Sequence, residues 1–223
     1  MNLYDRLMEL YEALREAFGH RQWWPGETPF EVMVGAILTQ RTSWENVEQA
    51  ISSLKGAGEL SPERLATLER ERLEELIRSA GYYRQKAARL QRLAEWLRER
   101  TGGEAAELDR LPTDELRREL LSVRGIGPET ADSILLYALE RPTFVVDTYT
   151  KRVTARHQLV DPQCGYYELK QLFEANLPRE LELYEDYHAQ LVELGKRYCR
   201  PRPRCENCPA RPVLGEPHLQ EGF

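Results

Sequence analysis

The sequence predicts an all-α fold on two observations. Apolar residues recur at helical spacing along most of the 223 residues, whereas no alternating strand pattern persists. Glycine and proline signals interrupt these stripes at short intervals, as expected where tight turns join helices. The length suffices for one large domain or two small ones with hydrophobic cores. We therefore expect many short helices and no internal repeat.

The composition is that of a globular protein, with 41% hydrophobic and 30% charged residues. No apolar run is long enough to span a bilayer and the N-terminus lacks a signal-peptide core, so we expect a cytoplasmic protein without membrane contact. The net charge of −6 argues only weakly against nucleic acid, because six lysines and arginines crowd the segment from Lys196 to Arg211.

In the N-terminal half, leucines at helical spacing predict a first helix over residues 3–18. Trp23 and Trp24 follow, before a Pro-Gly turn. Thr28 then caps a helix that has proline in its first turn and glutamate three residues after the cap. A polar break over residues 39–43 ends that helix. Further helices are expected after this break, at Ser61, shortly before Leu73, after Gly81, at Pro112, beyond Arg156 and near Leu181.

Residues 121–135 predict a helix, a tight glycine turn and a second helix. Gly125 and Gly127 bracket Ile126, and glycines there permit positive φ and leave backbone N–H groups uncovered. Pro128 suits the first position of the second helix, where its missing N–H is not needed. Backbone N–H groups at such a turn form an anion site, so this hairpin is the first candidate for a phosphate-binding surface.

A helix that opens at Asp147 follows the hairpin, and Gly125-Ile-Gly127 with Val146-Asp147 resembles the helix-hairpin-helix DNA glycosylases, the endonuclease III superfamily. The resemblance covers most of the chain and includes Leu38-Thr-Gln-Arg-Thr42, Gly81-Tyr-Tyr-Arg-Gln-Lys86 and the C-terminal cysteines. Within the superfamily the chain is most similar to the endonuclease III-like 3-methyladenine DNA glycosylases, on the strength of Trp23-Trp24-Pro25, the Thr39-Gln40 segment followed by Trp44, and the hairpin up to Leu135.

The resemblance implies two helical domains that flank a DNA-binding cleft. Residues 23–135 would form a six-helix domain ending in the helix-hairpin-helix. Residues 1–22 and 136–223 would form a discontinuous second domain with a C-terminal loop rich in cysteine and arginine. The implied activity is that of a DNA N-glycosylase of base excision repair, monomeric and nucleoid-associated, whose partner is double-stranded DNA containing damaged bases.

Asp147 is the predicted catalytic residue. Glycosidic cleavage passes through an oxocarbenium-like state, which a fixed carboxylate can stabilise while it activates water. The resemblance gives this role to Asp147; the alternative role, N-cap of the following helix, is compatible with it. Glu129 stands 18 residues earlier, where bifunctional members carry the lysine that forms a Schiff base. Glutamate cannot do this, so we predict a monofunctional enzyme with absent or weak AP lyase activity.

Trp23, Trp24, Trp44 and Glu129 are predicted to line the pocket for an extruded base. Aromatic faces stack on a flipped base, and their π-systems favour the positive charge of an alkylated purine such as 3-methyladenine. For any one of these tryptophans, packing in the core is the more common role. The predicted reaction is excision of a flipped alkylated purine, which leaves an abasic site.

The predicted DNA contacts come from the turns. Gln40, Tyr82 and Lys86 are candidates for filling the space left by the flipped base and for gripping the strands, with ordinary loop polarity as the alternative. Phosphate contacts are expected from Arg41, Arg124, Gly125, Ile126 and Gly127, together with a monovalent cation bound at the hairpin. For the two arginines, the alternative is a solvated surface charge.

Cys199, Cys205 and Cys208 resemble the start of the superfamily's four-cysteine loop for a [4Fe-4S] cluster, but Leu214 occupies the position of the fourth cysteine. Either three thiolates and another ligand hold the cluster, or the loop is a relic without iron, the interpretation we favour.

Two other functions are compatible with these residues. One is an endonuclease III-like glycosylase for oxidised pyrimidines or for mismatched thymine or uracil, which a panel of lesion-containing duplexes would identify. The other is a non-catalytic helix-hairpin-helix DNA-binding module, against which Asp147 at the family position argues.

Overall fold

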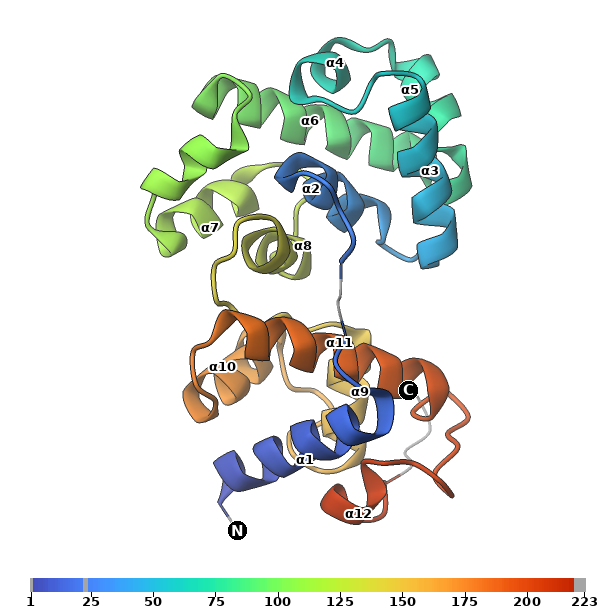
Figure 1. The fold of residues 1–223 in the computed structure, drawn as a ribbon, viewed down its shortest axis with the longest axis vertical. Coiled ribbons are helices and arrows are strands. Elements are labelled where there is room, and N and C mark those ends of the chain that lie inside the picture. Colours follow the sequence, from blue (N-terminus) through green and yellow to red (C-terminus); the bar gives the residue numbers. More distant parts are fainter. Residues whose placement is uncertain (1, 22–23, 219–223) are drawn as a thin grey trace. The chain divides into compact units, whose positions relative to one another are not determined.

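The computed structural model describes residues 2–21 and 24–218, and over these ranges it contains helices and no strand (Figure 1). The predicted all-α fold is confirmed, as is the division into two helical domains. One compact unit, here the terminal unit, joins Met1–Trp23 to Pro142–Phe223; the other, the hairpin unit, is Trp24–Arg141. None of the described helices is both long and apolar enough to cross a membrane.

The hairpin unit is built around α2 (Pro29–Leu38), in which every residue from Phe30 onward is buried. The predicted cap starts this helix, because the Thr28 hydroxyl accepts the N–H of Glu31 at 3.2 Å and Pro29 stands in the first turn. The surrounding elements are α3 (Trp44–Gly56), α4 (Pro62–Thr67), α5 (Arg70–Leu76), η1 (Arg78–Ala80), α6 (Tyr83–Thr101), η2 (Ala105–Arg110), α7 (Thr113–Ser122), α8 (Pro128–Ser133) and the π-helical η3 (Ile134–Ala138).

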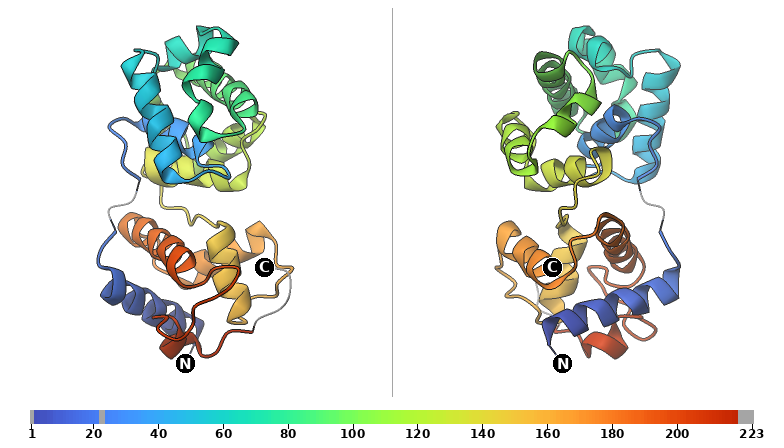
Figure 2. Two further views of the ribbon diagram at one scale, coloured as in Figure 1. Left: turned by 90° about the vertical axis from the view of Figure 1, so that its right-hand side faces the viewer. Right: turned by 60° about the vertical axis from the view of Figure 1, so that its left-hand side comes forward.

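The 19-residue helix α6 packs against α2, α4 and α5 (Figure 2). Its leucines at helical spacing, Leu90, Leu93 and Leu97, are fully buried in the core of the hairpin unit. Gly102 ends the helix in the left-handed conformation and returns its N–H to Arg98 O, a common helix stop. The polar face of α6 is thereby held close to the turns that connect its neighbours.

The terminal unit packs α1 (Leu3–Phe18) against α11 (Leu181–Arg197) (Figure 2). The buried carboxylate of Asp186 joins the two ends of the chain, since it accepts the Tyr11 hydroxyl at 2.9 Å and the N–H of Arg21 at 2.7 Å. The hydroxyl of Tyr187 donates to Leu7 O at 2.7 Å. The other helices of the unit are α9 (Thr148–Arg156), α10 (Tyr166–Asn176) and α12 (Arg211–Leu214).

Candidate active site

Asp147 is the N-cap of α9, and its side chain is only 11% exposed. Its Oδ1 accepts the backbone N–H of Thr150 at 2.7 Å and the hydroxyl of the same residue at 2.9 Å. Its Oδ2 lies 3.7 Å from Nε2 of His188 on α11. The predicted capping role is therefore present, and it uses one carboxylate oxygen while the other faces an imidazole.

His188 was not among the residues singled out from the sequence as functional, because it falls on the buried stripe of its helix. Burial alone would raise the pKa of Asp147. The neighbouring His188 and the hydrogen bonds from Thr150 outweigh burial and lower the pKa of this carboxyl below its usual value. Asp147 is thus a fixed, largely buried anion at neutral pH, the form needed to stabilise a cationic transition state.

Tyr149 brings α9 against α11 next to this anion. Its ring lies over Gly195, where an added Cβ would come within 2.7 Å of the ring and of the Tyr149 Cβ. Burial and the charge of Asp147 raise the pKa of the Tyr149 phenol. Arg152, one turn further on, donates to Cys199 O at 2.5 Å and to Gly195 O at 3.3 Å, so α9 is fastened to the end of α11.

The glycine turn between α7 and α8 differs from the prediction at one of its two glycines. Gly125 has φ +104°, and a Cβ there would lie 2.6 Å from Cγ of Arg89. Gly127 has φ −96° and ψ 178°, extended backbone open to any residue, and a Cβ there would meet no neighbouring atom within 4 Å. Only Gly125 is required by backbone conformation and by packing.

Ile126 does not fit the phosphate-binding role predicted for it. Its side chain is 5% exposed and belongs to the core of the hairpin unit. Its N–H donates to Val123 O at 3.0 Å within the turn. Ile126 therefore anchors the turn from the inside, and the neighbouring glycines and the exposed Arg124 remain as candidate phosphate contacts.

A buried ion pair joins the two helices of the hairpin. Arg117 of α7 donates from Nε and Nη2 to the two carboxylate oxygens of Asp132 on α8, at 2.7 and 2.9 Å. The Asp132 side chain is fully buried and that of Arg117 is 18% exposed. Such a two-pronged contact fixes the relative orientation of α7 and α8, and with it the shape of the glycine turn.

Two of the predicted pocket tryptophans lie together, and the structure adds a tyrosine to them. Trp24 stacks on Tyr137 of η3, with ring centroids 4.9 Å apart at 23°, and meets the edge of Trp44 at 5.8 Å and 72°. The indole N–H of Trp24 is buried without a hydrogen-bond partner among the described residues. Trp23 lies outside the residues that the structure describes. Glu129 is exposed in the first turn of α8.

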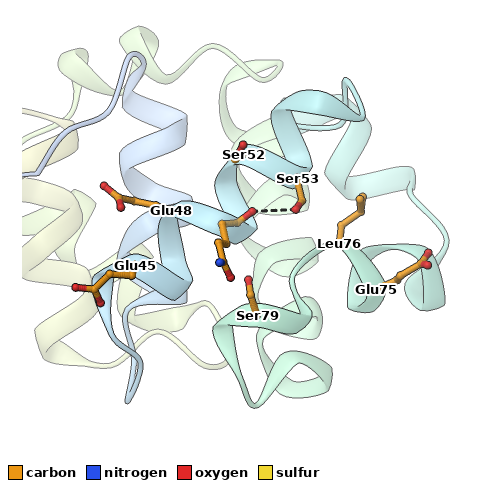
Figure 3. A pocket seen from close by; sticks show the side chains of 8 residues that line it. Glu45, Glu48, Ser52, Ser53, Glu75, Leu76 and Ser79 are labelled. Atoms are coloured by element: carbon orange, nitrogen blue, oxygen red, sulfur yellow. Dashed lines mark hydrogen bonds between the residues drawn. The ribbon is translucent and has the colours of Figure 1, made fainter.

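An open acidic groove runs along α3 beside Trp44 (Figure 3). Glu45, Glu48 and Glu75 contribute carboxylates to it, together with serines of α3 and η1. The indole N–H of Trp44 donates to Oε1 of Glu48 at 2.8 Å. Because carboxylates repel phosphates, this face of α3 is unsuited to contact a DNA backbone.

Both ends of the Gln40 amide are hydrogen-bonded, one to the hairpin and the other to α6. Its Nε2 donates to the Thr130 hydroxyl on α8 at 2.9 Å, and its Oε1 accepts a hydrogen bond from Arg89 of α6. The next residue, Arg41, is exposed and has φ +55°. Tyr82, at the N-cap of α6, has φ +46° and is 60% exposed. Both turns thus present a side chain from a left-handed backbone position.

The structure contradicts the DNA-gripping role predicted for Lys86, because this residue is only 1% exposed. The ammonium donates to Leu38 O at 2.8 Å, to the Thr42 hydroxyl at 2.7 Å and to Ala80 O at 2.7 Å. All three of its N–H groups have acceptors inside the unit. Burial lowers the pKa of Lys86 to about 8. Lys86 joins the Gln40 turn to the Tyr82 turn instead of contacting a strand.

The C-terminal cysteines do not form a donor set that fits a [4Fe-4S] cluster. Leu214, at the position of the fourth cysteine, is an apolar buried residue. Arg156 is 3% exposed and donates to Cys199 Sγ at 3.4 Å and to Arg200 O at 2.6 Å, so a cation holds this loop. Between residues 24 and 218 and in 2–21, no three His, Cys, Asp or Glu side chains are grouped to hold a metal. Burial also raises the pKa of the Cys205 and Cys208 thiols.

Comparison with known proteins shows the family to which the chain belongs. Residues 34–179 match the HhH-GPD superfamily of base excision DNA repair proteins. A putative DNA repair glycosylase of Methanocaldococcus jannaschii, MJ1434, is 47% identical over 212 residues, which cover 94% of this chain and 96% of that protein. Endonuclease III of Thermotoga maritima is 35% identical over 181 residues, which cover 81% of this chain and 79% of the relative.

Among solved structures, the H. pylori 3-methyladenine DNA glycosylase MagIII, bound to 1,N6-ethenoadenine, is similar with a TM-score of 0.74 and 27% identity. The similarity covers 88% of this chain and 98% of that one. The family match spans more than half of the chain, and the relatives align over most of their length. The chain therefore belongs to the HhH-GPD superfamily and is a base excision DNA glycosylase.

Proposed function

We propose that the chain is a monofunctional glycosylase that excises an alkylated purine of the 3-methyladenine type from double-stranded DNA and leaves an abasic site. The observation that carries the proposal is the chemistry of two positions. Asp147 supplies a buried carboxylate held by Thr150 and His188, whereas Glu129 supplies no amine at the start of α8. A carboxylate at position 147 together with glutamate in place of lysine at position 129 suits hydrolysis and not Schiff-base chemistry.

In the proposed reaction, the N-glycosidic bond breaks and its electron pair goes to the departing base. A base that carries a positive charge becomes neutral as it leaves, so it needs little help from a general acid. The sugar develops oxocarbenium character, which the Asp147 carboxylate stabilises. A water molecule then bonds to the anomeric carbon and gives a proton to the carboxylate, and the product is an abasic site.

The aromatic cluster of Trp24, Trp44 and Tyr137 is the proposed receptor for the base. Indole and phenol faces favour a cationic, flat ring over a neutral one of the same size. The H. pylori relative with a bound ethenoadenine supports a purine derivative as the ligand of such a site. Trp23, predicted with them, remains part of the proposal.

The exposed turn residues are the proposed DNA contacts. Tyr82 presents its ring to solvent from a left-handed position, which suits insertion between bases. Gln40 is proposed to fill the space of the extruded base. Arg41, Arg124, Gly125 and Gly127 are proposed to meet phosphates, with the monovalent cation at the hairpin. Lys86 is left out of this set because it is buried, and Ile126 because its N–H already donates to Val123 O within the turn.

The substrate is tested with duplexes that carry one lesion each. The panel contains methylated purine, 1,N6-ethenoadenine, uracil, a thymine mismatch and thymine glycol, and base release is measured before and after alkaline treatment. We expect release of the alkylated purine, with strand cleavage only after alkali. Preferential release of uracil, thymine or thymine glycol would replace the proposed substrate. A strong borohydride-trapped protein–DNA band would overturn the monofunctional mechanism.

The roles of the residues are tested by substitution in the same assay. Asp147→Asn keeps a good N-cap and should lower base release ~100-fold or more, with duplex binding retained. Trp24→Ala and Trp44→Ala should reduce base release far more than duplex binding. Trp96→Ala removes a tryptophan of α6 that packs against the same core and serves as the matched control. If Trp24→Ala and Trp44→Ala lose base release and duplex binding equally, as the Trp96→Ala control would on misfolding, the tryptophans have a folding role.

A further inference from the structure

Arg89, on the polar face of α6, contacts two of the proposed DNA-binding elements at once. One Nη1 N–H is donated to the amide oxygen of Gln40. The stem of the same side chain crosses the glycine turn, where Cγ, Cδ and Nε would lie 2.6, 3.1 and 3.1 Å from a Cβ on Gly125. The absence of a side chain at Gly125 therefore gives Arg89 its path to Gln40.

The contact with Arg89 also determines how the Gln40 amide is turned. A guanidinium only donates hydrogen bonds, so the amide oxygen must face it. The amide nitrogen then points to the hydroxyl of Thr130 on α8, at 2.9 Å. One N–H and one oxygen lone pair of the amide stay available for another partner. Gln40 is half-buried, so these remaining groups are held in a fixed direction.

We propose that Arg89 is a positioning residue that locks the amide of Gln40 to the glycine hairpin, so that the two grip damaged DNA as one rigid element. The proposal rests on the proposed roles of Gln40 and the hairpin. Rigid presentation lowers the conformational entropy lost on binding, which is the reason such a lock increases affinity for the damaged site. The length of the arginine side chain is needed, because a lysine ammonium at the same position is a shorter point donor.

Neighbouring charges provide the control. Arg92, three residues later on α6, donates from its side chain to the Arg124 carbonyl oxygen, at 3.4 Å. Its replacement by alanine removes the same charge from the same helix face without touching Gln40. Arg89→Lys, in contrast, keeps the charge and removes the guanidinium that donates to Gln40.

The experiment measures dissociation constants of the full chain for a duplex with a tetrahydrofuran abasic-site analogue and for the same duplex with an intact base. The ratio of the two constants reports the damage-specific grip, and non-specific phosphate contacts cancel in it. Gln40→Ala and Arg89→Lys should each lower this preference by about 10-fold, because the amide is then either absent or is ordered only on binding, at the cost of its side-chain entropy. The double variant should lose no more than either single variant.

Arg92→Ala should weaken binding to both duplexes alike and keep the wild-type ratio. Circular dichroism and thermal unfolding confirm that each variant is folded. If Arg89→Lys keeps the wild-type ratio while Gln40→Ala lowers it, the positioning role is overturned. If Gln40→Ala itself keeps the ratio, the proposed role of Gln40 fails, and the inference built on it fails for that separate reason. If the double variant loses preference for the damaged duplex by the product of the two single losses, the positioning role of Arg89 is also overturned.

Discussion

The guanidinium of Arg117 holds both carboxylate oxygens of Asp132, at 2.7 and 2.9 Å, across the two helices of the hairpin. Removal of the guanidinium takes two charged hydrogen bonds away from a fully buried carboxylate. We expect Arg117→Ala to lower the free energy of unfolding by about 3–5 kcal/mol. Arg110→Ala, which breaks an exposed pair with Glu107, is the control and should cost less than about 1 kcal/mol. Urea unfolding of both variants measures the difference; similar small losses would contradict the structural role.

The two glycines of the turn should respond differently to alanine. Gly127→Ala meets no neighbouring atom and needs no unusual φ, so the free energy of unfolding should change by less than about 0.5 kcal/mol. Its new methyl group should nevertheless weaken duplex binding, because the backbone can no longer approach a phosphate closely. Gly125→Ala should lose stability as well, owing to positive φ and the Arg89 stem. Chemical unfolding and binding at several salt concentrations test both; wild-type DNA affinity of Gly127→Ala would contradict the phosphate contact.

The lowered pKa of Asp147 predicts a pH-dependent stability. The folded state holds this carboxyl with a lower pKa than the unfolded chain, so its charge stabilises the fold above the unfolded pKa. This contribution is lost as the pH falls through the lowered, folded pKa. The difference in unfolding free energy between wild type and Asp147→Asn should therefore be constant near neutrality and shrink in acid. Thr148→Ala, an exposed neighbour, should show a pH-independent difference; the same pattern in both variants would contradict the assignment.

Lys86 predicts a second pH dependence of stability, at alkaline pH. Burial lowers its pKa from 10.5 to about 8, so the folded state binds fewer protons than the unfolded state between these values. Stability should rise with pH across that window, by up to about 3 kcal/mol, and the cost of the buried charge is fully present below it. Lys86→Met removes this dependence and takes the ammonium donor away from Leu38 O and Ala80 O. Unfolding of both proteins from pH 7 to pH 10.5 measures the difference; parallel curves would contradict it.

The sequence predicted what is decided locally. Thr28 and Asp147 each cap a helix through a contact three residues away, and leucine stripes such as that of α1 specify which face is buried. The glycine turn followed by Pro128 was equally recognisable. These features depend on neighbouring residues, so pattern and spacing were sufficient.

The features that the sequence did not predict depend on contacts between distant segments. Lys86 looks like a surface base in its own segment, and acceptors as distant as the carbonyl of Leu38, 48 residues away, hold it as a buried cation. Arg89 and Gln40, 49 residues apart, show no sequence signal of their partnership. The same holds for His188, whose position on a buried stripe hides its approach to Asp147. Side-chain roles at the site required the packing of the helices.

The helix that follows the glycine turn ends in the wide turn of η3, where the N–H of Leu139 donates to Ile134 O, five residues back, at 3.1 Å. A π-turn accommodates one residue more than an α-turn. Since each helical residue advances by about 100°, the extra residue decides that Tyr137 faces Trp24. Deletion of a single residue from this turn would bring an aliphatic side chain against the indole and leave the glycine turn unchanged. Which ring is available for stacking on Trp24 thus depends on the number of residues in this turn as well as on their identity.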